Sequence, residues 1–226
     1  IAASIYSAPN PGAAASISGN AISSVRDGIW LQQFTQNTSP FTISNNTIDT
    51  EVGSNINVGV RLYTIKDSSN VLVQDNAINS GALNGIQLWN ISTTSDVRIQ
   101  GGSIGAALDS GILLVNVRPG TGVPASGYAA RVVVDHVAIS GGLVGIQVVD
   151  SLANTLTQTL QITVTNDTSV IGAGTGILVS GSDATATITN NDNSFASNSL
   201  VGVDIANGGR VSLTGNTVSN NGVGVR

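Results

Sequence analysis

The sequence predicts an all-β fold, a single-stranded right-handed parallel β-helix that winds through about eight coils as a β-solenoid. Two short phrases recur in alternation along the chain, and no segment shows the sustained period of an amphipathic helix. We expect residues 1–226 to form one such domain. Because the sequence contains no Met, even at position 1, we also expect it to be a fragment or processed part of a larger protein.

The first phrase reads Gly-[Ile/Val]-x-[Leu/Val/Ile], and its last copy is cut short at Arg226. Its glycines lie 22 to 34 residues apart, at Gly28, Gly59, Gly85, Gly111, Gly145, Gly176, Gly202 and Gly224. Apolar and polar residues alternate after each glycine, which predicts a strand with one buried face. One coil has too little apolar surface to fold alone, so we expect the coils to stack and pair in parallel, with a rise of about 4.8 Å.

The second phrase precedes each copy of the first. It spans Ile17–Ile22, Ile43–Ile48, Val73–Ile78, Ile99–Ile104, Val134–Ile139 and Leu213–Val218, with looser copies that start at Val164 and Ile188. Its fourth position holds Asn20, Asn46, Asn76, Gly102, Val137, Asp167, Asn191 and Asn216. Asn and Gly tolerate left-handed backbone at tight bends, and stacked Asn amides can hydrogen-bond between strands. We therefore predict an internal Asn ladder; a polar binding groove is the alternative.

Three segments do not fit the repeat. Residues 32–40, 118–127 and 150–159 are predicted to be insertions that leave the coils as loops, and the second is rich in Pro and Gly.

The composition narrows the possible partners. Only 9% of the residues are charged, against about 25% in ordinary globular domains, and the net charge is −5. With no basic patch, nucleic acid is not an expected partner, and no apolar run is long enough to insert into a membrane. The absence of Cys excludes disulfides and Cys nucleophiles. A low-charge solenoid of this kind favours a secreted or cell-surface location, and we expect no cofactor.

The phrases ISNNTI (Ile43–Ile48) and NGIQL (Asn84–Leu88) resemble the repeats of the pectate-lyase-like superfamily. The resemblance extends from about Ala15 to Arg226 and implies the β-helix fold. It leaves function open, because that superfamily includes lyases, hydrolases, epimerases, phage tailspikes and adhesins.

The stretch around the single histidine, His136, resembles the Val-x-Ile-Asp-His stretch of family-one pectate lyases. The calcium and arginine motifs of that family do not occur at matching positions. We interpret His136 as a structural residue beside a turn. We expect no metal site, because no second His or Cys could complete one.

The register of the coils predicts one aromatic surface patch. The positions two and four residues after each glycine should point outward, which brings together Trp30, Gln32, Arg61, Tyr63, Gln87 and Trp89. Aromatic faces beside amides and a guanidinium suit sugar binding. The alternatives are that an inserted loop or a partner covers the patch, or that it is simply exposed.

Catalytic groups are sparse in this register. Lyases of the pectate-lyase type gather several carboxylates around Ca²⁺ and use a basic residue, and hydrolases need two carboxylates in one cleft. No outward column stacks carboxylates. Asp27 directly precedes a phrase glycine, and the equivalent positions in the next three coils hold Val58, Asn84 and Ser110. The remaining catalytic candidates are Asp27, Arg61 and Arg98, with Arg as a base or as an anchor for a substrate carboxylate. The alternative for each is a solvated surface charge.

The sequence therefore favours a non-catalytic extracellular or cell-surface module with a structural, adhesive or carbohydrate-interacting role. Its expected partners are polysaccharide or neighbouring subunits or domains of a surface assembly. The alternative is a polysaccharide lyase, glycoside hydrolase or epimerase that acts on an acidic polysaccharide.

Overall fold

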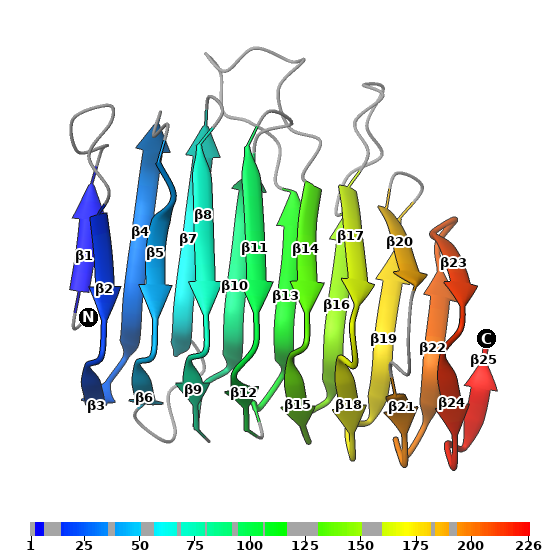
Figure 1. Ribbon diagram of the computed structural model, residues 1–226. Coiled ribbons are helices and arrows are strands. Elements are labelled where there is room, and N and C mark those ends of the chain that lie inside the picture. Colours follow the sequence, from blue (N-terminus) through cyan, green and yellow to red (C-terminus); the bar gives the residue numbers. More distant parts are fainter. Residues whose placement is uncertain are drawn as a thin grey trace.

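The computed structural model describes residues 3–6, 15–35, 39–50, 57–66, 69–79, 81–91, 95–105, 107–116, 131–150, 160–181, 184–189 and 194–226. In these ranges the chain is all-β and its strands form three parallel sheets. Neighbours in each sheet are three elements apart in the chain, so the chain visits the sheets in turn and the strands stack in sequence order (Figure 1). These ranges contain no helix long and apolar enough to cross a membrane.

The nine-stranded sheet carries the glycine phrases. Its strands are β1 (Ala3–Tyr6), β4 (Asp27–Thr35), β7 (Val58–Lys66), β10 (Asn84–Ile91), β13 (Ser110–Asn116), β16 (Val144–Asp150), β19 (Thr175–Ser180), β22 (Val201–Ala206) and β25 (Val223–Val225). The phrases did not predict β1, because it lacks the glycine; it pairs with β4, with Ala3 beside Ile29.

The second phrases divide between the two eight-stranded sheets. One, the β2–β23 sheet, consists of β2 (Ala15–Ser18), β5 (Phe41–Ser44), β8 (Asn70–Gln74), β11 (Asp96–Gln100), β14 (Arg131–Asp135), β17 (Leu160–Thr165), β20 (Ala184–Thr189) and β23 (Arg210–Thr214). The other, the β3–β24 sheet, consists of β3 (Ala21–Val25), β6 (Thr47–Thr50), β9 (Ala77–Ile78), β12 (Ser103–Ile104), β15 (Ala138–Ser140), β18 (Ser169–Ile171), β21 (Ser194–Ala196) and β24 (Thr217–Ser219). A tight bend separates the two strands of each phrase.

The alternation after each glycine predicts two inward columns, and the structure confirms them as the core except at the end of the stack, where Ile205 is half-buried and Val225 is 49% exposed. One runs through Ile29, Val60, Ile86, Ile112, Ile146, Ile177, Val203 and Val225, and the other through Leu31, Leu62, Leu88, Leu114, Val148, Val179 and Ile205. Most of these side chains are at most 2% exposed. Their burial is the main favourable term that holds the coils together.

The repeated glycine is explained by close contact between coils. A Cβ atom on Gly111 would lie 2.6 Å from Ile139 Cγ2 and 2.7 Å from the carbonyl oxygen of Gly145. The same clash with the next glycine's carbonyl recurs at Gly28, Gly59, Gly85, Gly145, Gly176 and Gly202. Any side chain at this corner would therefore push the coils apart.

The Asn ladder is confirmed in the first three coils. Asn20 Nδ2 donates to Asn46 Oδ1 at 2.9 Å, and Asn46 Nδ2 donates to Asn76 Oδ1 at 2.9 Å. The same oxygens accept the backbone N–H groups of Asn20 and Asn46. The ladder ends at Gly102, where a Cβ atom would lie 2.3 Å from the carbonyl oxygen of Asn76.

Two details of the ladder prediction are wrong. Of the predicted positions only Gly102 and Asp167 are left-handed; in the other described bends the left-handed residue lies one position earlier, as at Gly19, Asn45 and Asp75, so the ladder asparagines are free to point inward. In the sixth coil an extra residue shifts the register: Thr168 occupies the buried position and its Oγ1 accepts from Val137 N, while Asp167 is exposed. Asn191 lies outside the described residues.

The predicted insertions are only partly visible. Strand β4 continues to Thr35, so the first part of the segment 32–40 belongs to the nine-stranded sheet. Residues 118–127 and 151–159 lie outside the described residues.

The glycine column gives a stability test. We expect Gly111→Ala to lower the free energy of unfolding by about 3 kcal/mol, the upper end for overpacking, because the added methyl meets a backbone oxygen. For a chain of this length that corresponds to a fall in Tm of about 6–12 °C. Gly224→Ala is the matched control, since the same column position there has no atom within 4 Å. Equal melting temperatures for the two variants would contradict this explanation.

The ladder gives a second test. Asn46→Ala removes an amide that is 1% exposed. The change takes the Nδ2 donor from Asn76 Oδ1 and the Ile17 carbonyl, and the Oδ1 acceptor from Asn20 N and Nδ2. We expect a loss of about 3 kcal/mol in chemical denaturation. The neighbouring Asn45 is exposed and left-handed, so Asn45→Gly should change stability by less than about 1 kcal/mol. A similar loss in both variants would show that the amide ladder contributes little.

Candidate functional site

The outer face of the nine-stranded sheet brings the predicted patch together. Strand pairing places Trp30 beside Arg61 and Arg61 beside Gln87, and the next column runs through Gln32, Tyr63 and Trp89. Both outward columns continue as predicted to Asp204 and Ala206. All six patch side chains are half-buried, so each presents part of its surface on this face.

The aromatic residues of the patch are held by ring contacts. The Arg61 guanidinium carbon lies 5.2 Å from the centre of the Trp30 ring, a cation–π contact. The Tyr63 and Trp89 rings lie 5.6 Å apart and are tilted by 44°. These contacts restrict the orientation of the rings before any ligand arrives.

Asp27 is a buried charge between two arginines. It is 1% exposed, Arg26 Nε lies 3.3 Å from its Oδ2, and Arg61 Nη2 lies 3.2 Å from its Oδ1. The interpretation of Asp27 as a solvated surface charge is therefore wrong. A buried carboxylate is tolerated only when it is paired, and the two guanidiniums supply that pairing.

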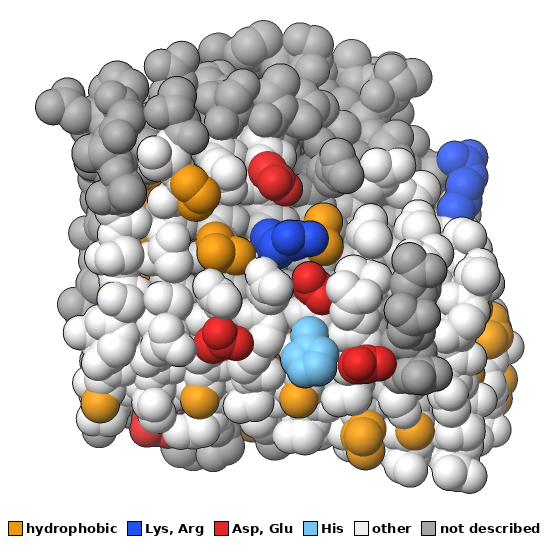
Figure 2. Space-filling model, in the orientation of Figure 1, with side chains coloured by type: hydrophobic (Ala, Val, Ile, Leu, Met, Phe, Trp, Pro, Cys, Tyr) orange, Lys and Arg blue, Asp and Glu red, His pale blue; other side chains and the backbone are white. Residues whose placement is uncertain are grey.

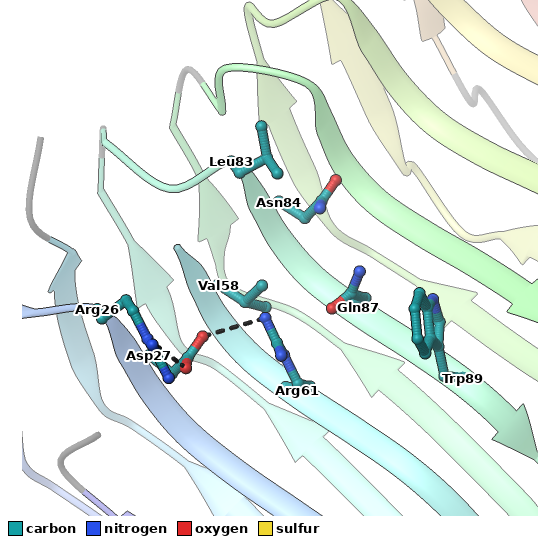
Figure 3. Close-up of a pocket in the computed structure, with 8 residues that line it drawn as sticks. All are labelled: Arg26, Asp27, Val58, Arg61, Leu83, Asn84, Gln87 and Trp89. Carbon is teal, nitrogen blue, oxygen red and sulfur yellow. Dashed lines mark hydrogen bonds and ion pairs between the residues drawn. The ribbon is translucent and has the colours of Figure 1, made fainter. Parts of the chain in front are cut away.

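These residues border a pocket of about 310 Å³ at the start of strands β4, β7 and β10. Its lining consists of Arg26, Asp27, Val58, Arg61, Leu83, Asn84, Gln87 and Trp89 (Figure 3). Asp27, Val58 and Asn84 are consecutive in one column across the three strands. The pocket thus combines one carboxylate, two guanidiniums, two amides and an indole on an apolar base.

Several buried polar atoms around the pocket form no hydrogen bond. They include Asp27 Oδ1, which has only its ion pair, together with Asn84 Oδ1 and Trp89 Nε1. Asn84 is 2% exposed, and the described residues offer its side chain no donor. Buried polar atoms are normally paired, so unpaired ones that line a pocket are positions where a ligand or water can bind.

The structure does not bring Arg98 to this site. It lies on β11, in the β2–β23 sheet, where its side chain is 49% exposed and Nη2 lies 3.9 Å from Asp135 Oδ2. The charged groups on that face gather near its middle, and most of the rest is uncharged (Figure 2).

At the end of the outward column that starts at Trp30, Arg226 Nη2 donates to Asp204 Oδ2 at 2.6 Å, and this hydrogen bond raises the pKa of Arg226.

His136 lies at the predicted turn. Its backbone is left-handed, with a φ of 56°, and its side chain is exposed beside the buried Asp135. Among the described residues, no group of three or more His, Cys, Asp or Glu side chains could hold a metal ion. This geometry agrees with a structural role for His136.

The sequence did not identify Arg26 and Asn84 as members of the site. Asn84 was noted only because it follows Asp27 in the column without being a carboxylate. Arg26 precedes the glycine phrase and belongs to no repeated position. A signal did exist for both residues: each lies within two positions of a phrase glycine, in the coils that carry the aromatic patch.

Comparison with known proteins adds no assignment. No protein-family model matches the chain, and neither a curated protein nor a solved structure matches it. What the pocket binds is therefore inferred from the side chains that line it.

Proposed function

We propose that this chain is a non-catalytic module of a secreted or cell-surface protein that binds carbohydrate on the outer face of its nine-stranded sheet. The observation that carries the proposal is the pocket itself, which the half-buried Trp89 lines together with Asn84, and in which Trp89 Nε1 and Asn84 Oδ1 form no hydrogen bond. Sugars present apolar ring faces that stack on aromatic side chains and hydroxyls that need hydrogen-bond partners.

The fold supports an elongated binding surface. We infer that the coils are right-handed, because parallel strands joined by a crossover are right-handed in about 98% of cases. The three sheets support a count of about eight coils. The phrases Ile43–Ile48 and Asn84–Leu88 support placing the chain in the pectate-lyase-like superfamily, whose members include both enzymes and adhesins.

The charge inventory of the pocket favours binding over hydrolysis. Asp27 is the one carboxylate among the described residues that line it, and both of its oxygens face arginines. A glycoside hydrolase needs two carboxylates on opposite sides of the scissile bond. A lyase or epimerase acting on an acidic polysaccharide remains the alternative, with Arg61 as the basic group.

The ring of Trp89 provides the test. We expect Trp89→Ala to weaken oligosaccharide binding by about 30-fold, the equivalent of about 2 kcal/mol for an aromatic anchor residue. Isothermal titration calorimetry against oligosaccharides chosen from a glycan array would measure this loss. Leu200→Ala removes a side chain that is 63% exposed and is not part of the pocket, so it should bind as the unmodified chain does.

The same oligosaccharides should be recovered uncleaved after long incubation. Product formation that disappears in Arg61→Ala would establish the enzyme alternative. Failure of the unmodified chain to bind any glycan would refute the proposal.

A further inference from the structure

We propose, building on the carbohydrate-binding function above, that the pocket takes a neutral sugar and holds it through hydroxyl groups that donate to Asp27 and Asn84. This assigns the class of ligand and the two residues that select it.

The column of Asp27, Val58 and Asn84 presents two side-chain oxygens that can accept hydrogen bonds. Asn84 Oδ1 is buried and accepts no hydrogen bond from the described residues, whereas the buried Asp27 Oδ1 faces one cation, Arg61 Nη2 at 3.2 Å, and accepts no hydrogen bond. A carboxylate or amide oxygen with a free lone pair accepts hydrogen bonds and cannot donate, so a ligand that binds at these two positions presents hydrogen atoms to them. The hydroxyls of any sugar donate, whereas a carboxylate group only accepts, so a hydroxyl and not a carboxylate suits these two positions.

The spacing of the two acceptors suits a sugar ring. Asp27 and Asn84 lie two coils apart in one column, which corresponds to about 9.6 Å at the usual separation of parallel strands. Val58 lies between them and gives the pocket an apolar base. A ring resting over Val58 would place hydroxyls toward an acceptor on either side, with Trp89 further along β10 (Figure 3).

The two arginines do not make this an anion site. Each already contacts an oxygen of Asp27, at 3.3 Å for Arg26 and 3.2 Å for Arg61, and Arg61 also stacks on Trp30. A carboxylate on the ligand would have to share these guanidiniums with a buried negative charge that cannot move into water. Like charges in one site oppose each other, so the Asp27 carboxylate selects against acidic sugars.

The decisive experiment compares matched neutral and acidic ligands. Binding of cellohexaose, xylohexaose and mannohexaose is measured by calorimetry beside binding of hexagalacturonate, at low and high salt. We expect at least one neutral hexasaccharide to bind at least tenfold more tightly than hexagalacturonate, with little dependence on salt.

Three variants test the roles of Asp27 and Asn84, and one of them should affect neutral and acidic sugars in opposite directions. Asp27→Asn removes the negative charge and one acceptor, so it should weaken neutral binding at least tenfold, whereas it would strengthen binding of an acidic sugar. Asn84→Val installs the residue that Val58 provides one coil earlier, so it should weaken binding at least tenfold while the melting temperature is unchanged or raised. Thr175→Val, at the same column position in a coil away from the pocket, is the control.

The outcomes separate the two proposals. Preferential, salt-sensitive binding of hexagalacturonate that Asp27→Asn strengthens would overturn this inference and leave carbohydrate binding intact. Neutral binding that survives both Asp27→Asn and Asn84→Val would also overturn it, because the ligand would then lie elsewhere. A lower melting temperature in Asn84→Val, with unchanged affinity, would assign Asn84 a purely structural role. Absence of binding to every hexasaccharide, and to a glycan array, would refute the proposed function itself.

Discussion

The close approach of successive coils at the glycine corner is the constraint on which the rest of this structure depends. A Cβ atom on Gly28 would lie 2.5 Å from the carbonyl oxygen of Gly59, and the corresponding contact recurs along the stack. This contact fixes the register of the nine-stranded sheet, because a shift of one residue would place a side chain where none fits. Once the register is fixed, the residue two positions after each glycine must lie beside its counterpart, which is how Trp30 comes to lie against Arg61.

The Asn ladder and the pocket occupy the same three coils. Asn20, Asn46 and Asn76 hydrogen-bond through the bends that lead into β3, β6 and β9, and β4, β7 and β10 follow them and carry the pocket. The amides bond to both backbone and side chain, so they hold these coils at a constant separation. A binding surface gains affinity when its groups are fixed before the ligand arrives, and the ladder supplies that rigidity.

The sequence was informative where the repeat is regular and silent where a side chain leaves it. The columns of Ile29 and Trp30 follow directly from the alternation of apolar and polar residues after each glycine. The position of Asp167 was wrong because one additional residue in a loose copy of the phrase moves Thr168 into the column. The burial of Asp27 could not be predicted, because it depends on the Arg61 side chain from the next coil reaching back to it. Arg98 belongs to a different sheet from Asp27 and Arg61, and the residue types of these three catalytic candidates did not reveal that difference.

In a repeat protein, equivalent positions of successive coils show which residue types the fold requires and which it does not. The column that holds Asp27 and Asn84 places Val58 between them and continues through Ser110, Val144, Thr175 and Val201. These residues are small or apolar, and all but the half-buried Val144 are buried. The solenoid therefore folds at this position without a carboxylate or an amide. Burying Asp27 requires two arginines to offset its desolvation, and burying Asn84 leaves an oxygen without a donor. Neither residue is explained by coil stacking, and both border the same pocket. A ligand that donates hydrogen bonds to them supplies the explanation that the fold does not.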